Sequence, residues 1–255
     1  MGKFLLKTGL IGLCAVVLAG CGRKGPLMTP ESLAPAAIVD LRVEQKGAQF
    51  QVSWSRPSSE EGGQALKDLA GFRLFKREVL PAGEDCEECP TAYRLALSVD
   101  LEYLQGIAVA GNRYLFSDGD LAEGKTYRYK VHSLKKDGTV SRASNRAGRK
   151  KVAPPLAPVL KAASSMNEVL LEWGGVSPPA GGRIAGYNIY RKESGGTVYL
   201  APLNNAPVQE ATFADKEPEW GKRYDYAIRA VAVVDGETVE SGPSNEVRAG
   251  LTEPE

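Results

Sequence analysis

Hydrophobic and polar residues alternate in short stretches along most of the chain. Residues 50–54 (Phe-Gln-Val-Ser-Trp) and 127–131 (Tyr-Arg-Tyr-Lys-Val) both place an apolar side chain at every second position. A period of two is typical of a β-strand that buries one of its faces. Stretches with helical spacing are scarce after the first 20 residues, and 28 glycines and 16 prolines supply turns. The pattern therefore predicts an all-β protein made of many short strands.

The strand pattern occurs twice in the chain. When Trp54 is placed on Trp173, residues 70–78 align with residues 185–193, and each block holds two aromatic residues three positions apart, a basic pair and a glutamate. An ordered repeat of this kind predicts two similar domains, although one larger all-β domain with a chance internal echo is the alternative. The later matching positions are Phe116 with Phe213, Asp118 with Asp215, Tyr127 with Tyr224, Asp137-Gly138 with Asp235-Gly236, and Ser144-Asn145 with Ser244-Asn245.

The repeated features resemble the fibronectin type III domain, twice, over roughly residues 36–250. The family marks are an early tryptophan, at Trp54 and Trp173, and a tyrosine corner, in which Tyr127 and Tyr224 each follow a glycine three residues earlier. The resemblance implies an all-β fold of two tandem fibronectin type III-like, or immunoglobulin-like, β-sandwiches. Each tryptophan can then bury on the order of 200 Å² between its two sheets. We therefore expect a core role for both rather than ligand stacking.

The first 21 residues follow a different pattern. Lys3 and Lys7 precede a nearly wholly apolar stretch at 10–19, which ends in small residues before Cys21. This order predicts a secretory signal peptide. A membrane-spanning helix is not expected, because it needs roughly 20 apolar residues and this stretch is limited to residues 10–19. Residues 18–21 (Leu-Ala-Gly-Cys) also resemble the lipobox of bacterial lipoproteins. That resemblance implies cleavage before Cys21, a thioether-linked diacylglycerol on its sulfur and an acylated amino terminus (palmitate chains). An ordinary signal peptide with a chance cysteine is the alternative.

The residues after the lipobox cysteine carry a second resemblance. Residues 21–27 read Cys-Gly-Arg-Lys-Gly-Pro-Leu, which is similar to the amino-terminal motif of the small LptM lipoproteins of Gram-negative bacteria. That family is associated with assembly and oxidative maturation of the lipopolysaccharide translocon. The absence of aspartate after Cys21 implies, by the same kind of resemblance, transport to the outer membrane, where the chain would face the periplasm. The rest of the chain is unlike that short family, and the motif can equally be a tether with a turn at Gly25-Pro26.

These features give an expected organisation of the whole chain. The proline-rich linker should restrict the two domains to a limited range of angles. The expected segments are a signal peptide (1–20), a lipidated flexible tether (21–35), a first fibronectin type III-like domain with an insertion (36–150), the linker (151–158), a second fibronectin type III-like domain (159–250) and a tail (251–255).

The first repeat is longer than the second. Trp54 and Tyr127 are 73 residues apart, whereas Trp173 and Tyr224 are 51 apart. Because the second copy completes its repeat without the extra residues, we expect the core not to need the insertion at 79–113 and hypothesise that it forms a recognition surface. Within the insertion, the alternating pattern from Leu95 to Leu101 can form an extra edge strand. The alternative is that this strand only completes the first sheet.

Cys86 and Cys89 are the only cysteines beyond Cys21. A local structural disulfide is the favoured expectation, with redox or metal chemistry and free thiols as alternatives. A zinc site needs about four ligands, and His132, the one histidine, alternates with basic residues and is expected to face solvent. The acidic residues around the pair would raise the thiol pKa, which argues against a thioredoxin-like motif. The carboxylate pairs at 60–61 and 87–88 are expected in solvated loops.

The charge and the motifs of the chain exclude several classes of function. Without residues 1–20 the chain has 30 Lys and Arg against 31 Asp and Glu, so there is no electrostatic case for nucleic-acid binding. A single histidine argues against a Ser-His-Asp or Cys-His arrangement, and nucleotide-binding glycine motifs are absent. We therefore expect no catalytic residue, cofactor or metal.

The expected function is that of a non-catalytic outer-membrane lipoprotein that binds or scaffolds an envelope protein. The alternatives are an accessory periplasmic redox protein using Cys86 and Cys89, or a glycan-binding module.

Overall fold

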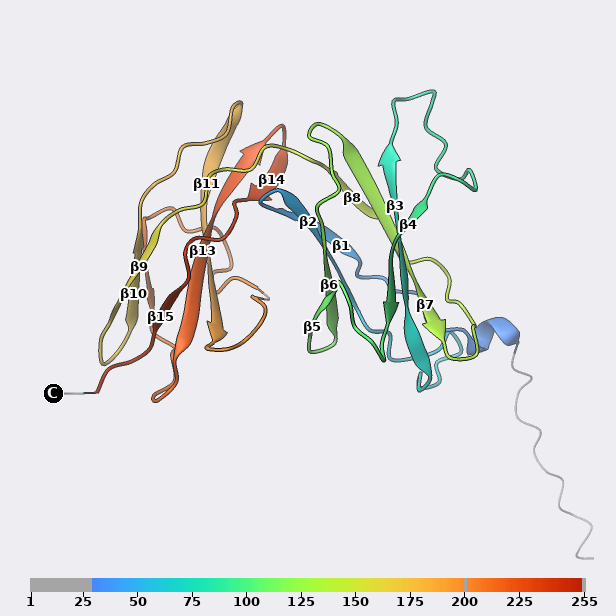
Figure 1. The fold of residues 1–255 in the computed structure, drawn as a ribbon, viewed down its shortest axis with the longest axis horizontal. Helices are drawn as coiled ribbons and strands as arrows, with labels where there is room; N and C mark the ends of the chain where they lie inside the picture. The colour runs from blue at the N-terminus through green and yellow to red at the C-terminus, as the bar shows by residue number, and fades with distance from the viewer. Residues whose placement is uncertain (1–28, 200, 254–255) are drawn as a thin grey trace, which may run out of the picture.

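The computed structural model describes residues 29–199 and 201–253. The expected signal peptide and the lipidation residue Cys21 lie outside these ranges. The described residues form strands and one short 3-10 helix, η1 (Pro30–Leu33), which comes first (Figure 1). The strands are β1 (Arg42–Lys46), β2 (Gln49–Ser55), β3 (Leu69–Val79), β4 (Arg94–Asp100), β5 (Ala108–Ala110), β6 (Arg113–Asp118), β7 (Thr126–Lys135), β8 (Ala147–Lys150), β9 (Leu160–Ser164), β10 (Val169–Trp173), β11 (Gly182–Glu193), β12 (Thr212–Asp215), β13 (Tyr224–Val234), β14 (Glu237–Glu240) and β15 (Val247–Ala249).

The first domain is a sandwich of two antiparallel layers. One layer has the order β1-β2-β6-β5 and the other has the order β4-β3-β7-β8. The core between them holds the apolar faces of β2, β3 and β7, as their period of two predicts. Trp54 is fully buried there and contacts the rings of Phe72 and Tyr114, with centroids 5.6 and 6.1 Å away. The expected core role of this tryptophan is confirmed.

The second domain repeats this arrangement. Strands β12-β10-β9 form one layer, and β11, β13, β14 and β15 form the other. Trp173 lies between them, with its ring 5.3 Å from that of Tyr187. The prediction of an all-β chain with two tandem sandwiches is therefore confirmed.

The repeated residues make equivalent contacts in the two domains. The hydroxyl of Tyr127 accepts a hydrogen bond from the backbone N–H of Ala122 at 2.9 Å, and that of Tyr224 accepts one from Glu219 at 3.3 Å. These are tyrosine corners.

Each repeated asparagine links the end of its domain to the start of that domain by hydrogen bonds. The side chain of Asn145 bonds both backbone groups of Leu41, at 3.0 Å each, and Asn245 does the same to Leu160, at 2.8 and 2.9 Å.

The two domains share one sheet, which the sequence does not reveal. Strand β1 of the first domain pairs in parallel with β14 of the second, so that the sheet runs β11-β13-β14-β1-β2-β6-β5, and the two domains form an arch (Figure 1). The Gln45 side chain is buried in this junction. Its amide donates to the carbonyl of Val152 at 2.6 Å, and its oxygen accepts from the N–H of Val152 at 3.1 Å. The linker is thus fixed where it begins. Arg149 and Glu237 form an ion pair across the same boundary at 3.0 Å.

The structure describes the last residues of the segment expected to be a tether, 21–35. Helix η1 and the residues after it pack on the first domain. The N–H of Gly62 donates to the carbonyl of Ser32 at 2.8 Å, and the Lys135 ammonium donates to that of Leu33 at 3.2 Å. Pro30 at the first helical position favours the short helix. Residues 30–35 therefore belong to the domain. Across residues 29–199 and 201–253, no helix has the length and apolar character that crossing a membrane requires.

Candidate recognition surface at the disulfide loop

The insertion at 79–113 consists of two parts with different roles. Its second part completes the first sandwich. Strand β4 pairs with β3 along its length, Val99 is buried, and Ile107 and Val109 pack against the core. The expectation that the core does not need the insertion is therefore wrong for these residues. A length difference between two repeats shows where residues were added and does not show whether they are packed.

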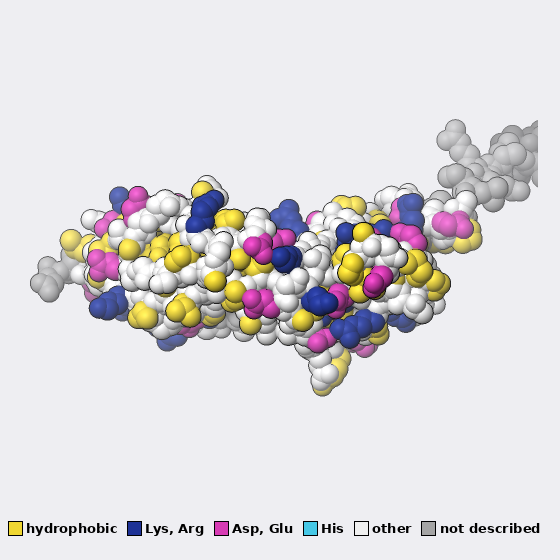
Figure 2. Space-filling view, turned by 90° about the horizontal axis from the view of Figure 1, so that it is seen from above, with side chains coloured by type: hydrophobic (Ala, Val, Ile, Leu, Met, Phe, Trp, Pro, Cys, Tyr) yellow, Lys and Arg dark blue, Asp and Glu magenta, His cyan; other side chains and the backbone are white. Residues whose placement is uncertain are grey.

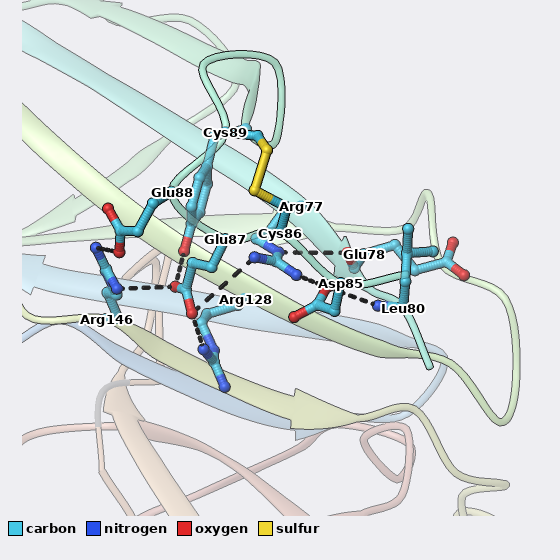
Figure 3. Close-up of polar contacts among 11 residues, drawn as sticks. Arg77, Glu78, Leu80, Asp85, Cys86, Glu87, Glu88, Cys89, Arg128 and Arg146 are labelled. Carbon is cyan, nitrogen blue, oxygen red and sulfur yellow. Dashed lines mark hydrogen bonds and ion pairs between the residues drawn. A yellow bond between two sulfur atoms is a disulfide. The ribbon is translucent and has the colours of Figure 1, made fainter. Parts of the chain in front are cut away.

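Residues 80–93 remain as an exposed connection between β3 and β4, which we call the disulfide loop. The sulfur atoms of Cys86 and Cys89 are bonded to each other in it (Figure 3). Both cysteines are exposed, whereas Glu87 between them is only half-exposed. The carboxylate of Asp85 accepts a hydrogen bond from the N–H of Leu80 at 3.0 Å, which closes the start of the loop.

Glu87 anchors the disulfide loop to the sheet below. Its carboxylate accepts a hydrogen bond from the Tyr93 hydroxyl at 2.7 Å, and it forms ion pairs with Arg128 on β7 and with Arg146 at 3.3 Å (Figure 3). Burial acts to raise the pKa of Glu87. The Tyr93 hydrogen bond and the two guanidinium charges outweigh burial and hold this pKa below its usual value. The expectation that the pair at 87–88 lies in a solvated loop is wrong for Glu87.

Cations from three segments meet the acidic side chains of this loop. Arg77, which is buried at the end of β3, pairs with Asp85, and Arg146 pairs with Glu88 at 2.7 Å. The ammonium of Lys130 lies 4.2 Å from the centre of the Tyr93 ring, a cation–π contact. Burial and the neighbouring carboxylate together raise the pKa of Tyr93 to about 12. The loop is therefore held in one position by charges at its base while its tip stays exposed.

The other polar residues singled out in the sequence lie elsewhere. His132 is half-buried rather than solvent-facing, with Nδ1 3.0 Å from the carbonyl of Ser141 and its ring 5.7 Å from that of Phe75. Glu60 is buried and pairs with Lys135 at 2.8 Å, so the expected solvated loop is wrong there too. Within the described ranges, no group of three or more His, Cys, Asp or Glu side chains is placed to hold a metal ion.

Sequence reasoning missed the cations that hold the loop. Arg128 and Arg146 lie 41 and 59 positions after Glu87. The pairing of β3 with β7 brings Arg128 near the loop, and the pairing of β7 with β8 brings Arg146, which directly precedes β8. The only signal in the sequence is a pair of glutamates between two cysteines. On the wider surface, Figure 2 shows basic and acidic side chains interspersed on the face seen from above.

A family match agrees with the fold of the second domain. Residues 160–249 match the family described as fibronectin type III domain, SaeA third domain. The second domain is fibronectin type III-like. The first domain shares its tyrosine corner, its buried tryptophan and its Ser-Asn contacts, so both sandwiches are fibronectin type III-like.

Comparisons with whole proteins and with solved structures give partial matches. Over 142 residues the chain is 32% identical to an amylopullulanase of Thermoanaerobacter thermohydrosulfuricus; this match covers 56% of the chain and 8% of that protein's length. Among solved structures, the chicken CNTN1 FN1–FN3 domains are 16% identical with a TM-score of 0.36, covering 87% of this chain and 67% of that one. A Fn3-like protein from Clostridium thermocellum is 24% identical with a TM-score of 0.31, covering 40% of this chain and 99% of that one.

Proposed function

We propose that this protein is a non-catalytic lipoprotein of the Gram-negative outer membrane, anchored through lipid on Cys21 and facing the periplasm. In this proposal it binds or scaffolds another envelope protein, and assembly of the lipopolysaccharide translocon is the specific case suggested by residues 21–27. The leader pattern with its lipobox supports the anchor. Two fibronectin type III-like sandwiches support a binding or scaffolding role, although a fold alone does not fix function.

The observation that carries the binding role is the anchored disulfide loop. Loops carry recognition when a rigid scaffold positions them. Here Glu87 and Asp85 fix the loop to β3 and β7, and the second domain is fixed to the first through β1 and β14. A partner that binds the loop tip then finds it already ordered, which reduces the entropy lost on binding.

The anchor is tested by Cys21→Ser. If Cys21 carries the lipid, this variant should leave the membrane fraction or accumulate as an uncleaved precursor, because its serine cannot form the thioether. Cell fractionation and mass spectrometry of the amino terminus measure this. Wild type and variant that are equally soluble in the periplasm would refute the anchor.

The binding role is tested by capturing partners with a variant of the loop. Replacing residues 81–92 by a short glycine-containing turn should leave β3 and β4 paired and reduce recovery of the partner by about tenfold or more, the effect of losing one strong contact. The measurement is affinity capture from solubilised membranes, quantified by mass spectrometry. A matched control replaces the exposed turn at 165–167 in the second domain, between β9 and β10, which should leave recovery unchanged. Equal recovery by both folded variants would contradict the role of the loop.

An accessory redox function is the second candidate, because both cysteines are exposed to exchange with other thiols. The same capture separates the two functions. In the double variant Cys86→Ser/Cys89→Ser, the ion pairs of Glu87 still hold the loop, so a recognition surface should keep most of its partner. Loss of the partner from this folded variant alone would favour redox chemistry.

A further inference from the structure

The described chain begins at one end of the first domain. Thr29 lies eight residues after Cys21, and eight residues of extended chain reach at most ~28 Å. Helix η1 is hydrogen-bonded to this end through Ser32 and Leu33. A membrane that holds the lipid of Cys21 would therefore lie within ~28 Å of this end of the domain.

Four connections meet at this end, which we call the amino-terminal pole. They are η1, the loop at 60–68, the turn at 101–106 after β4 and the turn at 136–140 after β7, which lie together at the lower right of Figure 1. Backbone hydrogen bonds join them. The N–H of Leu101 donates to the carbonyl of Ala70, and that of Lys136 to the carbonyl of Asp68, both at 2.9 Å.

The amino-terminal pole exposes large apolar side chains. Tyr103 is 67% exposed, Leu104 46%, Val140 43% and Leu33 42%. A hollow of about 610 Å³ separates η1 from the turn that carries Val140. Each connection except the 60–68 loop thus contributes an apolar or aromatic residue that the domain core does not use. Tyrosine and leucine at the end of a membrane-anchored domain suit the boundary between lipid headgroups and acyl chains.

Three cations of the pole are paired with its carboxylates. Lys136 pairs with Glu102 at 2.7 Å, and Arg142 with Glu61 at 2.6 Å. Lys135 pairs with Glu60 and with Asp68, at 2.8 and 3.2 Å. With these charges compensated, attraction to anionic lipid is weak, and burial of apolar area is the driving force that remains.

We propose that the amino-terminal pole rests on the bilayer that holds the lipid of Cys21, with Tyr103 and Leu104 in the headgroup region. The inference rests on the anchor in the proposed function. Strand β3 has 11 residues and runs from this pole to the disulfide loop, which corresponds to roughly 35 Å at the rise of a strand. The first domain then stands upright as a spacer that presents the disulfide loop about that far from the membrane.

Tryptophan quenching tests the orientation. Trp54 and Trp173 are buried, so Trp220→Phe removes the only exposed indole among the described residues. In that background, Tyr103→Trp places a probe at the pole. Leu156→Trp places a matched probe in the linker, at a site that is 73% exposed. The lipidated protein is reconstituted in phosphatidylcholine vesicles that carry bromine on the acyl chains.

The emission that Tyr103→Trp adds to that of the Trp220→Phe background should fall about twofold, as for an aromatic side chain in the interface. The emission that Leu156→Trp adds should stay unchanged. Half-molar salt should not restore the emission, because paired charges do not drive the contact. Leu104→Trp repeats the test if the first variant does not fold. Equal emission from the pole and linker probes in brominated and ordinary vesicles would overturn the proposal.

A second arm separates this proposal from the anchor itself. Residues 21–255 are coupled through Cys21 to a maleimide phospholipid in the same vesicles, since Cys86 and Cys89 are bonded to each other and leave Cys21 as the free thiol. If the native chain carries no lipid, the proposed anchor fails, yet the coupled chain still reports on the pole. An unquenched Tyr103→Trp in the coupled chain overturns the membrane contact whatever the native anchor is.

Discussion

Trp54→Ala is expected to lower the free energy of unfolding of the first domain by about 3–5 kcal/mol, the usual loss when a large core side chain is removed. Trp54 is fully buried between the two layers and packs on Phe72 and Tyr114. Neither sheet can collapse into the space that the indole leaves, because both are fixed by their strand pairing. Domains commonly have only about 5–15 kcal/mol of stability. Chemical denaturation followed by circular dichroism measures the loss.

The shared sheet adds a second expectation to this experiment. When the first domain unfolds, β14 loses its neighbour β1, and Val152 loses the Gln45 amide. The melting temperature of the second domain should therefore fall as well, by less than that of the first. Trp173→Ala provides the control, with the larger effect in the second domain. A second domain that melts unchanged in the Trp54→Ala variant would show that the junction carries no stability.

The strands and the repeat could be predicted because their signal is local. In β7, every second side chain is buried, and the alternating pattern at 127–131 predicts this directly. The matching of Trp54 with Trp173 and of Tyr127 with Tyr224 was likewise visible, because each pair holds the same position in its sandwich. Such residues make their packing contacts within one domain, so the sequence of that domain is enough to identify them.

The junction and the anchored loop could not be predicted, because their contacts join residues that are far apart in the sequence. The pairing of β1 with β14 uses backbone groups at two strand edges, and nothing in the side-chain alternation distinguishes an edge that is paired from one that is free. The inward position of Glu87 depends on Arg128 and Arg146, which only the tertiary fold brings near. Glutamate in a polar stretch is exposed in most proteins, and its partners are what reverse that preference here.

A buried ion pair repeated in both domains leads to the second large effect. In the first domain, Lys76 pairs with Asp118 at 2.8 Å, and Asp118 also accepts a hydrogen bond from the Tyr129 hydroxyl at 2.6 Å. In the second, Arg191 pairs with Asp215 at 2.8 Å, and Tyr226 donates to that carboxylate at 2.9 Å. The repeat therefore preserves a polar cluster inside each sandwich as well as an apolar core. Burial, together with the Asp118 carboxylate, raises the pKa of Tyr129, so this tyrosine stays a hydrogen-bond donor.

Asp118→Ala is expected to destabilise the first domain by about 3–5 kcal/mol, because it leaves the Lys76 ammonium buried without its main counter-charge. Lys76 is 2% exposed, and its remaining carboxylate neighbour, Asp120, is 3.6 Å away. The double variant Lys76→Met/Asp118→Asn removes both charges, keeps an acceptor for the Tyr129 hydroxyl and should recover most of the loss. Asp215→Ala should cost less, since the Arg191 side chain is 19% exposed and can reach water. Denaturant titrations of the three variants decide the matter: a double variant as unstable as Asp118→Ala would mean that the loss comes from packing and not from an unpaired charge.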